Sequence, residues 1–399
     1  MRYYLLALFS ALFYRFPSRE IRVVAVSGTK GKSTTVELIG AILEEAGYRV
    51  ALSSTVRFKI GDRSENNLFK MTMPGRGFLQ RFLRRAVKAG CEYAVIEMTS
   101  EGARQFRHKF IDLDAFIFTN LAPEHIESHG SYGAYAQAKL DIAQALVESP
   151  KPARVMIVNA DDQETPRFLA LEGPEKISYR LEQLEPIAIT GRGTEFTFEG
   201  ARMLTKLPGQ FNLYNLLAAM NLARFQGVSL EIIKEAVEKF GGVRGRMEPV
   251  GWQDFQVIID YAHTPDSLRQ VYETFPRERK IAVLGGTGGG RDKWKRPLMG
   301  QIAAEHCDFI ILTNEDPYDE NPEQIVREIA AGIKNKEYKI IMDRRLAIRE
   351  ALRQVRAGDV VLITGKGTDP YIMGPHGNKI PWDDATVAHE ELEKLKTHA

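Results

Sequence analysis

The residues best suited to chemistry in this 399-residue chain form one glycine-rich segment, Gly28-Thr29-Lys30-Gly31-Lys32-Ser33-Thr34. It stands between a strand-like and a helix-like pattern. Glycines let backbone N–H groups approach phosphate oxygens, and a helix N-terminus adds a favourable potential for anions. Lys32 can reach β- and γ-phosphates, and Ser33 can bind Mg²⁺. The usual pattern starts with glycine where this chain has Val26. We interpret the segment as a GxxGKST nucleotide-binding loop rather than a purely structural turn.

A second glycine-rich segment spans residues 284–296 (LGGTGGGRDKWKR) and combines backbone flexibility with positive charge. It is either a second phosphate-facing loop or a solvated basic loop. Two phosphate loops in two domains would let a nucleotide sit between them, since ligands favour clefts between domains.

Alternating strand and helix patterns position these loops. Such alternation predicts βαβ units and a mostly parallel sheet. The predicted strands are 21–27, 48–54, 92–98, 114–120, 154–160, 255–262, 280–286, 308–314, 338–343 and 359–365. The predicted helices are 33–46, 78–88, 132–147, 212–225, 265–274, 297–306, 322–334 and 345–355. Short alternating runs over residues 176–206 predict a small antiparallel addition.

Glycines at residues 241–245 end a helical pattern and mark a predicted domain boundary. We therefore expect an apolar N-terminal segment (1–20), a central α/β domain (21–244) and a C-terminal α/β domain (245–399). The central domain would carry the nucleotide loop, and the second would be Rossmann-like.

Composition restricts the function class. Hydrophobic residues make up 44% and charged residues 27%, which is typical of a globular protein, and the net charge of +2 argues against a nucleic-acid binder. Two cysteines, Cys91 and Cys307, cannot build a disulfide framework or a Cys-rich zinc site. We expect a cytoplasmic protein.

Residues 3–14 (YYLLALFSALFY) form an uncharged run between Arg2 and Arg15. A spanning helix needs about 20 apolar residues, so this run predicts no transmembrane span. Arg15-Phe16-Pro17 replaces the small-residue cleavage site of an export signal. Two interpretations stay open: a short helix packed on the protein body, or peripheral contact with a membrane.

Several ordered motifs resemble those of the Mur ligases, the ATP-dependent ligases that build cell-wall peptides. The first loop is similar to the family's Gly-Thr-Asn-Gly-Lys-Thr/Ser-Thr, with Lys30 in place of Asn. Thr72-Met73-Pro74 resembles a Thr-Thr-Pro of the ligases that add the third residue of the stem peptide. The other motifs are 119–139 (TNLAPEHIESHGSYGAYAQAK), 207–219 (LPGQFNLYNLLAA), 245–248 (GRME), 260–268 (DYAHTPDSL), 290–300 (GRDKWKRPLMG), 343–348 (DRRLAI) and 365–369 (GKGTD).

The resemblance implies an ADP-forming acid–amino-acid ligase that uses ATP and Mg²⁺ at two sites, with small-molecule substrates. A muramoyl-peptide carboxylate would attack the γ-phosphate, and an amino acid's amine would then displace phosphate from the acyl phosphate. Fixed cations should stabilise the charge that develops in both steps. Glu97 and His125 match the family's metal-binding glutamate and histidine, and Lys139 matches a lysine carbamylated to bind Mg²⁺. Without the resemblance, these three would pass for a surface carboxylate, a solvated histidine and an exposed helical lysine. The implied catalytic residues are Lys32, Glu97, His125 and Lys139, and the implied metal ligands are Ser33, Glu97, His125 and Lys139.

The resemblance also assigns the remaining contacts. Those on the nucleotide side, beyond the loop, are Asn120, Asn212, Asn215, Arg246, His263, Asp292, Lys293 and Arg296. Those of the amino acid and its acceptor are Thr72, Pro74, Glu315, Asp316, Tyr318, Asp343, Arg344, Gly365, Lys366 and Asp369.

The amino-acid pocket departs from the family pattern. Ligases that use diaminopimelate carry Asp-Asn-Pro-Arg, whose Arg grips the distal carboxylate, where this chain has Glu315-Asp316-Pro317-Tyr318. Thr368-Asp369 replaces His-Glu, and Glu101 stands at the place of a histidine. The bidentate cation is gone and negative charge is added, which favours an amino acid with a distal cation, such as lysine.

Family members usually open with a domain that holds the UDP end of the substrate. Here the nucleotide loop begins at residue 28, so we expect that domain to be absent. Three alternatives remain: a ligase with another acceptor, such as a folate polyglutamate or polyamino acid; the synthase subunit that amidates lipid-linked wall precursors, which normally carries a four-cysteine zinc insert; and a non-catalytic nucleotide-binding regulator. Joint retention of Lys32, Glu97, His125 and Lys139 argues against the regulator.

Overall fold

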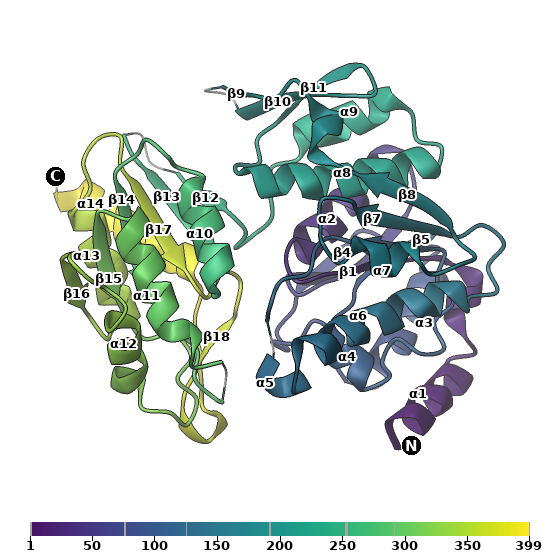
Figure 1. Cartoon of the computed structure of the whole chain (residues 1–399), viewed down its shortest axis with the longest axis horizontal. Coiled ribbons are helices and arrows are strands. Elements are labelled where there is room, and N and C mark those ends of the chain that lie inside the picture. Colours follow the sequence, from purple (N-terminus) through teal and green to yellow (C-terminus); the bar gives the residue numbers. More distant parts are fainter. Residues whose placement is uncertain are drawn as a thin grey trace. The chain divides into compact units, whose positions relative to one another are not determined.

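The structure, a computed structural model, describes residues 2–75, 77–124, 126–190, 193–251, 254–290 and 292–398. The chain divides into two compact units, residues 1–241 (unit 1) and 242–399 (unit 2) (Figure 1). Each unit is built on its own mostly parallel sheet with flanking helices, which confirms the predicted α/β fold class.

Unit 1 is organised around an eight-stranded sheet in the order β4-β3-β2-β5-β1-β6-β7-β8. All neighbours from β2 to β8 pair in parallel, whereas β3 and β4 form an antiparallel edge. The strands are β1 (Arg22–Ser27), β2 (Val50–Ser53), β3 (Arg57–Ile60), β4 (Arg63–Asn66), β5 (Tyr93–Glu97), β6 (Ala115–Phe118), β7 (Val155–Asn159) and β8 (Glu175–Tyr179). The carboxyl ends of the parallel strands meet along one edge, where ligands bind in open α/β sheets.

Helices cover both faces of this sheet. They are α1 (Arg2–Phe13), α2 (Lys32–Glu45), α3 (Phe78–Lys88), α4 (Ser100–Arg104), α5 (Ile126–His129), α6 (Tyr132–Val147), α7 (Thr165–Leu169), α8 (Gln210–Phe225) and α9 (Leu230–Lys239), with 3₁₀ turns η1 (Pro17–Glu20) and η2 (Leu181–Leu184). The bounds predicted for α3 and α6 are confirmed. The sequence reading missed α9, although Ser229 caps its N-terminus.

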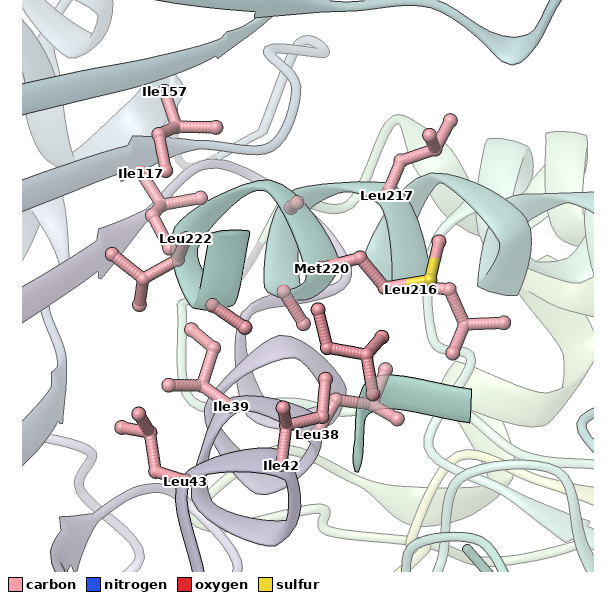
Figure 2. Close-up of a cluster of buried hydrophobic side chains, with 14 of the residues drawn as sticks. Leu38, Ile39, Ile42, Leu43, Ile117, Ile157, Leu216, Leu217, Met220 and Leu222 are labelled. Carbon is pink, nitrogen blue, oxygen red and sulfur yellow. The ribbon is translucent and has the colours of Figure 1, made fainter. Parts of the chain in front are cut away.

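The core on one face of the sheet lies between the strands and the crossing helices α2 and α8 (Figure 2). Leu38 and Ile42 of α2 face Leu216 and Met220 of α8, and Ile117 of β6 joins them. Alternate strand residues reach the opposite face, where α3 and α6 bury a second cluster. Burial on both faces explains why these strands read as continuous apolar runs.

A small antiparallel sheet, β11-β10-β9, stands beside the main sheet and confirms part of the predicted addition. Its strands are β9 (Ala188–Thr190), β10 (Gly193–Phe198) and β11 (Ala201–Thr205). The start of the predicted stretch belongs elsewhere, because β8 pairs in parallel with β7 and extends the main sheet. Its polar sequence suits an edge strand.

Most of the N-terminal run 3–14 lies in α1, which contacts the body of unit 1 on one side. Ala7 and Ala11 are its buried residues. The Tyr4 ring packs edge-on against Phe106 and Phe110, with centroid distances of 5.8 and 5.1 Å. No helix in the described part of the chain is long and apolar enough to cross a membrane.

Unit 2 holds a six-stranded sheet in the order β12-β13-β17-β14-β15-β16, parallel except for the edge strand β12. The strands are β12 (Glu248–Val250), β13 (Gln256–Asp260), β14 (Lys280–Leu284), β15 (Phe309–Leu312), β16 (Tyr338–Ile340) and β17 (Val360–Thr364), and β18 (Tyr371–Met373) and β19 (Lys379–Pro381) form a hairpin. The helices are α10 (Pro265–Glu273), α11 (Lys295–His306), α12 (Pro322–Ala330), α13 (Arg344–Arg353) and α14 (Asp384–His398), with the 3₁₀ turn η3 (Pro375–Gly377). A separate core packs α13 and α14 on this sheet.

His108 is buried between α4 and β6. Within the described residues, neither of its ring nitrogens has a hydrogen-bond partner. Burial therefore lowers the pKa of His108 to about 4, and the charge of Lys109 adds to the effect.

This histidine predicts an acid-sensitive unit 1. The unfolded chain takes up the proton near pH 6.5 and the folded chain only near pH 4, so stability falls as the pH drops through that window. Between about pH 7.5 and pH 5 the wild type should lose about 2 kcal/mol of unfolding free energy that His108→Leu does not lose. Urea unfolding of both proteins at the two pH values measures the difference. Equal pH dependence would contradict the prediction.

Candidate active site

The phosphate loop joins the end of β1 at Ser27 to the start of α2 at Lys32, as the sequence predicted. Gly28 and Gly31 adopt positive φ angles of 150° and 82°. A Cβ at Gly28 would collide with Oγ1 of Thr119, and one at Gly31 with Oδ1 of Asn215. Both glycines are therefore required by backbone conformation and by close packing.

Asn120, which follows β6, holds the loop from the side. Its carbonyl accepts from Thr29 N–H at 2.8 Å, and its Oδ1 accepts from Lys30 N–H at 2.9 Å. Thr119 Oγ1 donates to the carbonyl of Lys30 at 2.7 Å. The predicted nucleotide residue Asn120 thus positions the loop backbone here.

The two loop lysines have different surroundings. Lys30 Nζ donates to Glu124 at 3.0 Å. Lys32 Nζ donates to the carbonyl of Thr29 at 2.9 Å and lies 3.9 Å from Glu97. Lys32 is therefore curled over its own loop, the position from which a lysine reaches bound phosphates.

Glu97, at the carboxyl end of β5, is the hub of a buried polar cluster. Its Oε2 accepts from Ser33 Oγ at 2.9 Å and from the N–H and Oγ1 of Thr55 at 2.8 and 3.0 Å. Thr55 Oγ1 also lies 2.7 Å from Oγ1 of Thr72. The fold thus brings together the predicted residues Ser33, Glu97 and Thr72. Pro74 follows Thr72 in the same segment and is buried.

This cluster suits a hard cation such as Mg²⁺, whose ligands are oxygens. A carboxylate and hydroxyl groups converge beside the loop. His125, the predicted histidine ligand, lies outside the described residues. Within them, no three His, Cys, Asp or Glu side chains converge as a metal cluster. A Mg²⁺ here would therefore rely on Glu97, Ser33 and non-protein oxygens.

Lys139 of α6 is buried and donates from Nζ to the carbonyl of Gly28 at 2.6 Å. Burial and the nearby charge of Lys32 lower the pKa of Lys139 well below its ordinary value, although Glu124 and Glu97 act in the opposite direction. The Nζ atom also lies 4.8 Å from the centre of the Tyr135 ring. The predicted exposed-helix alternative is therefore wrong for Lys139.

Asn212 and Asn215 lie on the buried face of α8. Asn215 accepts from Thr35 Oγ1 at 3.3 Å and donates to Asn212 at 3.0 Å, and Asn212 donates to the carbonyl of Pro208 at 2.7 Å. This chain of hydrogen bonds connects α8 to the start of α2. Asn215 also packs against Gly31, so these asparagines contact the loop as well as α2.

In unit 2, the structure separates the predicted nucleotide residues into two groups. The Arg246 guanidinium lies over the Tyr261 ring at 4.2 Å, and His263 Nδ1 is 2.9 Å from the carbonyl of Tyr261. Both side chains are partly accessible. They can therefore approach a ligand.

The second group surrounds Arg296, which is buried and bonds Glu328 at 2.6 Å and Glu320 at 3.0 Å. Lys293 is exposed and lies 3.3 Å from Glu320, while Asp292 is buried. Arg296 thus has a structural role in holding α11 against α12. Of this group, Lys293 is the cation best placed to meet a phosphate.

Several of the predicted amino-acid residues of unit 2 form a buried charged cluster at the carboxyl edge of the second sheet. Lys366 Nζ lies 2.8 Å from Asp316 and 3.6 Å from Asp369. Arg344 is paired with Asp384 at 2.8 and 2.6 Å. Asp316 also accepts from the N–H of Met373 at 2.8 Å.

Glu315 completes this cluster and is buried. Its Oε1 accepts from Thr287 at 2.7 Å, whereas its Oε2 has no hydrogen-bond partner in the described residues. Burial and the neighbouring Asp316 raise the pKa of Glu315 above its ordinary value. Gly365, with φ of 105°, leaves the room for this carboxylate, since a Cβ there would collide with Oε2.

Two further predicted pocket residues have local structural roles. Tyr318 adopts a positive φ of 52°, and its N–H donates to the carbonyl of Met373. Asp343 caps the N-terminus of α13 through Leu346 N–H at 2.9 Å. Their side chains are both accessible enough to meet a ligand as well.

Thr55 and Glu124 also belong to the site, and the sequence analysis did not predict them. Thr55 comes two residues after β2 ends, at the same sheet edge as Ser27 and Glu97. The rule that ligands bind at the carboxyl edge of parallel strands could have identified it. Glu124 was not predicted, because it lies in a polar segment whose sequence is typical of an exposed loop.

Profiles of two families match the chain: the Mur ligase middle domain over residues 26–223 and the Mur ligase glutamate ligase domain over residues 245–367. The chain is 38% identical to a UDP-N-acetylmuramyl-tripeptide synthetase of Roseiflexus sp. (strain RS-1), covering 98% of this chain and 82% of that protein. The chain belongs to the Mur ligase family. It is therefore an ATP-dependent amino-acid ligase.

Solved structures agree with this assignment. A UDP-N-acetylmuramoyl-L-alanyl-D-glutamate–2,6-diaminopimelate ligase is 31% identical, with a TM-score of 0.64 over 94% of this chain and 79% of that one. A folylpolyglutamate synthase of Mycobacterium tuberculosis, solved with ADP, shares the fold at 16% identity, with a TM-score of 0.73 over 92% of each chain.

The packing at Gly31 makes a testable prediction. Ala at a positive φ costs about 1–2 kcal/mol, and at Gly31 the added Cβ must also displace Asn215. We expect Gly31→Ala to lower the unfolding free energy by about 1–3 kcal/mol more than Gly47→Ala, as measured by urea unfolding. Gly47 is a matched control, because its φ is 87° and nothing in the described residues lies within 4 Å of the added atom. Equal costs for the two variants would contradict the steric argument.

Proposed function

We propose that this Mur ligase adds an amino acid to a muramoyl-peptide acceptor during peptidoglycan precursor synthesis. The observation that carries the proposal is the link between the phosphate loop and the β5 carboxylate, in which Ser33 Oγ donates to Glu97 at 2.9 Å beside Lys32. A buried carboxylate that is hydrogen-bonded to the loop serine is placed to hold Mg²⁺ on a bound nucleoside triphosphate, which the ligase reaction requires. The similarity to the tripeptide synthetase supports the acceptor class.

The reaction has two displacement steps, one at the γ-phosphorus of ATP and one at the acyl carbon of the acceptor. A carboxylate oxygen of the acceptor attacks the γ-phosphorus of ATP, and the bond to ADP breaks. The amino acid's amine then attacks the acyl carbon, loses a proton and expels phosphate. Lys32 and the loop N–H groups stabilise the charge that develops on the phosphoryl oxygens. Bound Mg²⁺ would neutralise phosphate charge, held by Glu97 and Ser33.

The site residues beyond the loop enter as part of the same proposal. Asn212, Asn215, Arg246 and His263 serve the nucleotide, and Lys293 serves a phosphate. The two free, buried cysteines, Cys91 and Cys307, are consistent with a cytoplasmic enzyme. Neither contributes a four-cysteine zinc insert, which disfavours the amidating-subunit alternative.

The charged cluster in unit 2 supports a cationic amino acid. Glu315, Asp316, Asp369 and Asp384 supply four carboxylates, whereas Lys366 and Arg344 supply two cations. Oε2 of Glu315 and Nη1 of Arg344 have no hydrogen-bond partner among the residues that the structure describes. Oε2 can accept from a distal ammonium, and Nη1 can donate to the α-carboxylate. Lysine meets both requirements.

An amino-acid screen tests the function. With ATP and a UDP-muramoyl-dipeptide, lysine should stimulate ADP release more than diaminopimelate, and Lys32→Ala should abolish the release. Glu315→Gln should raise the KM for lysine about tenfold, because the amide oxygen can still accept a hydrogen bond but no longer carries the charge that strengthens it. The exposed Glu337→Gln is the matched control.

The outcomes separate the alternatives. Stimulation by diaminopimelate alone would overturn the lysine assignment and leave the ligase intact. ADP release only with a folate and glutamate would show that the acceptor is a folate and not a muramoyl peptide. Nucleotide binding without turnover under any of these conditions would contradict the ligase proposal.

We further propose that Lys139 is carbamylated and supplies an oxygen to a second Mg²⁺. Burial lowers the pKa of Lys139, which favours the neutral amine that reacts with CO₂, and the amine lies beside the loop at the carbonyl of Gly28. Its nitrogen forms a bond to the carbon of CO₂ and releases a proton, and the product is an anionic carbamate. That anion would offset the charge of Lys32.

Carbon-13 NMR in labelled bicarbonate tests this modification directly. The wild type should show a carbamate signal that Lys139→Arg lacks. Lys151→Arg is the matched control, because Lys151 also donates to a backbone carbonyl, that of Ile21 at 3.0 Å, but is paired with a carboxylate, that of Asp114 at 3.2 Å. A wild-type protein without the signal, or a signal that survives in Lys139→Arg, would refute the proposal.

A further inference from the structure

Helix α1 exposes large apolar side chains, whereas a surface helix normally buries them against the protein. Its buried residues are the small Ala7 and Ala11, whereas its large apolar side chains point outward. Phe9, Leu12 and Phe13 are 64%, 51% and 79% exposed. The helix lies at the edge of unit 1 (Figure 1), and no charged residue interrupts positions 3–14.

A second apolar segment continues this surface. Leu68, Phe69 and Met71 are exposed in the loop before α3. The Phe69 ring packs edge-on against Phe78, the first residue of α3, at 5.9 Å. The preceding Gly77 lies against Ser10 of α1, so both segments border the same end of α3. We call Leu5, Leu6, Phe9, Leu12, Phe13, Leu68, Phe69 and Met71 the apolar face.

Positive charge surrounds the apolar face. Residues 1–19 and 66–91 contain no Asp or Glu, although the whole chain is nearly neutral at +2. These segments carry the basic residues Arg2, Arg15, Arg19, Lys70, Arg76, Arg81, Arg84, Arg85 and Lys88. The fold brings the segments together, because Arg84 donates to the carbonyls of Tyr14 and Arg15 at 3.0 and 3.1 Å.

Other basic side chains of α3 extend the charge beyond this contact. Arg81 and Lys88 are three and four residues from Arg84 and so share its side of the helix. Both are exposed, as is Arg85. Of the nearby acids, Glu20 is paired with Arg84 and Asp112 with Arg19. The surface around the apolar face therefore has a net positive charge.

We propose that the apolar face is a membrane-docking surface that binds an anionic lipid bilayer, with α1 lying in the plane of the interface. An in-plane helix inserts apolar side chains at the headgroup boundary, while basic residues bind anionic lipid. α1 is too short to span a bilayer but long enough to lie on one. The charge distribution selects a bilayer over a second copy of this chain, since two such positive surfaces repel.

Vesicle co-sedimentation of the full chain tests the proposal. Wild type should bind vesicles of phosphatidylglycerol and phosphatidylcholine far better than phosphatidylcholine alone, and salt should weaken the binding. Phe9→Glu with Phe13→Glu should reduce binding at least tenfold. Arg81→Gln, Arg85→Gln and Lys88→Gln together should weaken binding to anionic vesicles, by about fivefold for each residue lost.

The matched control is Ile189→Glu with Ile380→Glu, which places the same charges at exposed apolar residues elsewhere. It should bind like the wild type. Retained ATP binding in every variant reports a folded unit 1 and keeps this test independent of the ligase reaction. Wild type that ignores vesicles, or Phe9→Glu with Phe13→Glu that binds normally, overturns the proposal. So does a wild-type dimer that this double variant dissociates, because the occupant is then a second copy.

Discussion

The packing of the phosphate loop against two asparagines is the constraint on which the rest of the site depends. Asn120 binds the loop backbone from the end of β6, and Asn215 touches Gly31 from α8. A Cβ at either Gly28 or Gly31 would break this arrangement. Because the loop cannot shift, Lys32 and Ser33 leave it in fixed directions, toward Glu97. The placement of these polar side chains therefore follows from the packing of the loop backbone.

The buried ionisable side chains of the two units differ in how well hydrogen bonds compensate their burial. Glu97 is compensated by three hydrogen-bond donations, so its burial is stable. Lys139 and Glu315 are less well compensated, and burial shifts each toward its neutral form. Buried ionisable groups with shifted pKa values often mark functional sites. At Lys139 and Glu315, a substrate or a covalent modification could supply the missing interactions.

The sequence predicted the elements whose patterns are local. The loop, α3 and α6 depend on periodicity and on glycine placement, and they were found with the correct bounds or nearly so. The β3–β4 edge was missed because its strands, RFKI and RSEN, lack a continuous apolar run. The burial of Lys139 and the ion pairs of Arg296 depend on residues far along the chain, so no local pattern could reveal them. Family motifs identified both residues but not their surroundings.

The separate cores of the two units have a thermodynamic consequence. The clusters that pack α2, α8, α3 and α6 lie within unit 1, and the cluster around α13 and α14 lies within unit 2. Each unit can therefore melt as its own cooperative transition, and a single melting temperature would not describe the chain. A nucleotide held by the phosphate loop adds its binding free energy to the transition of unit 1. Calorimetry with and without ATP would show whether the transition of unit 1 shifts alone or together with that of unit 2, which carries Arg246, His263 and Lys293.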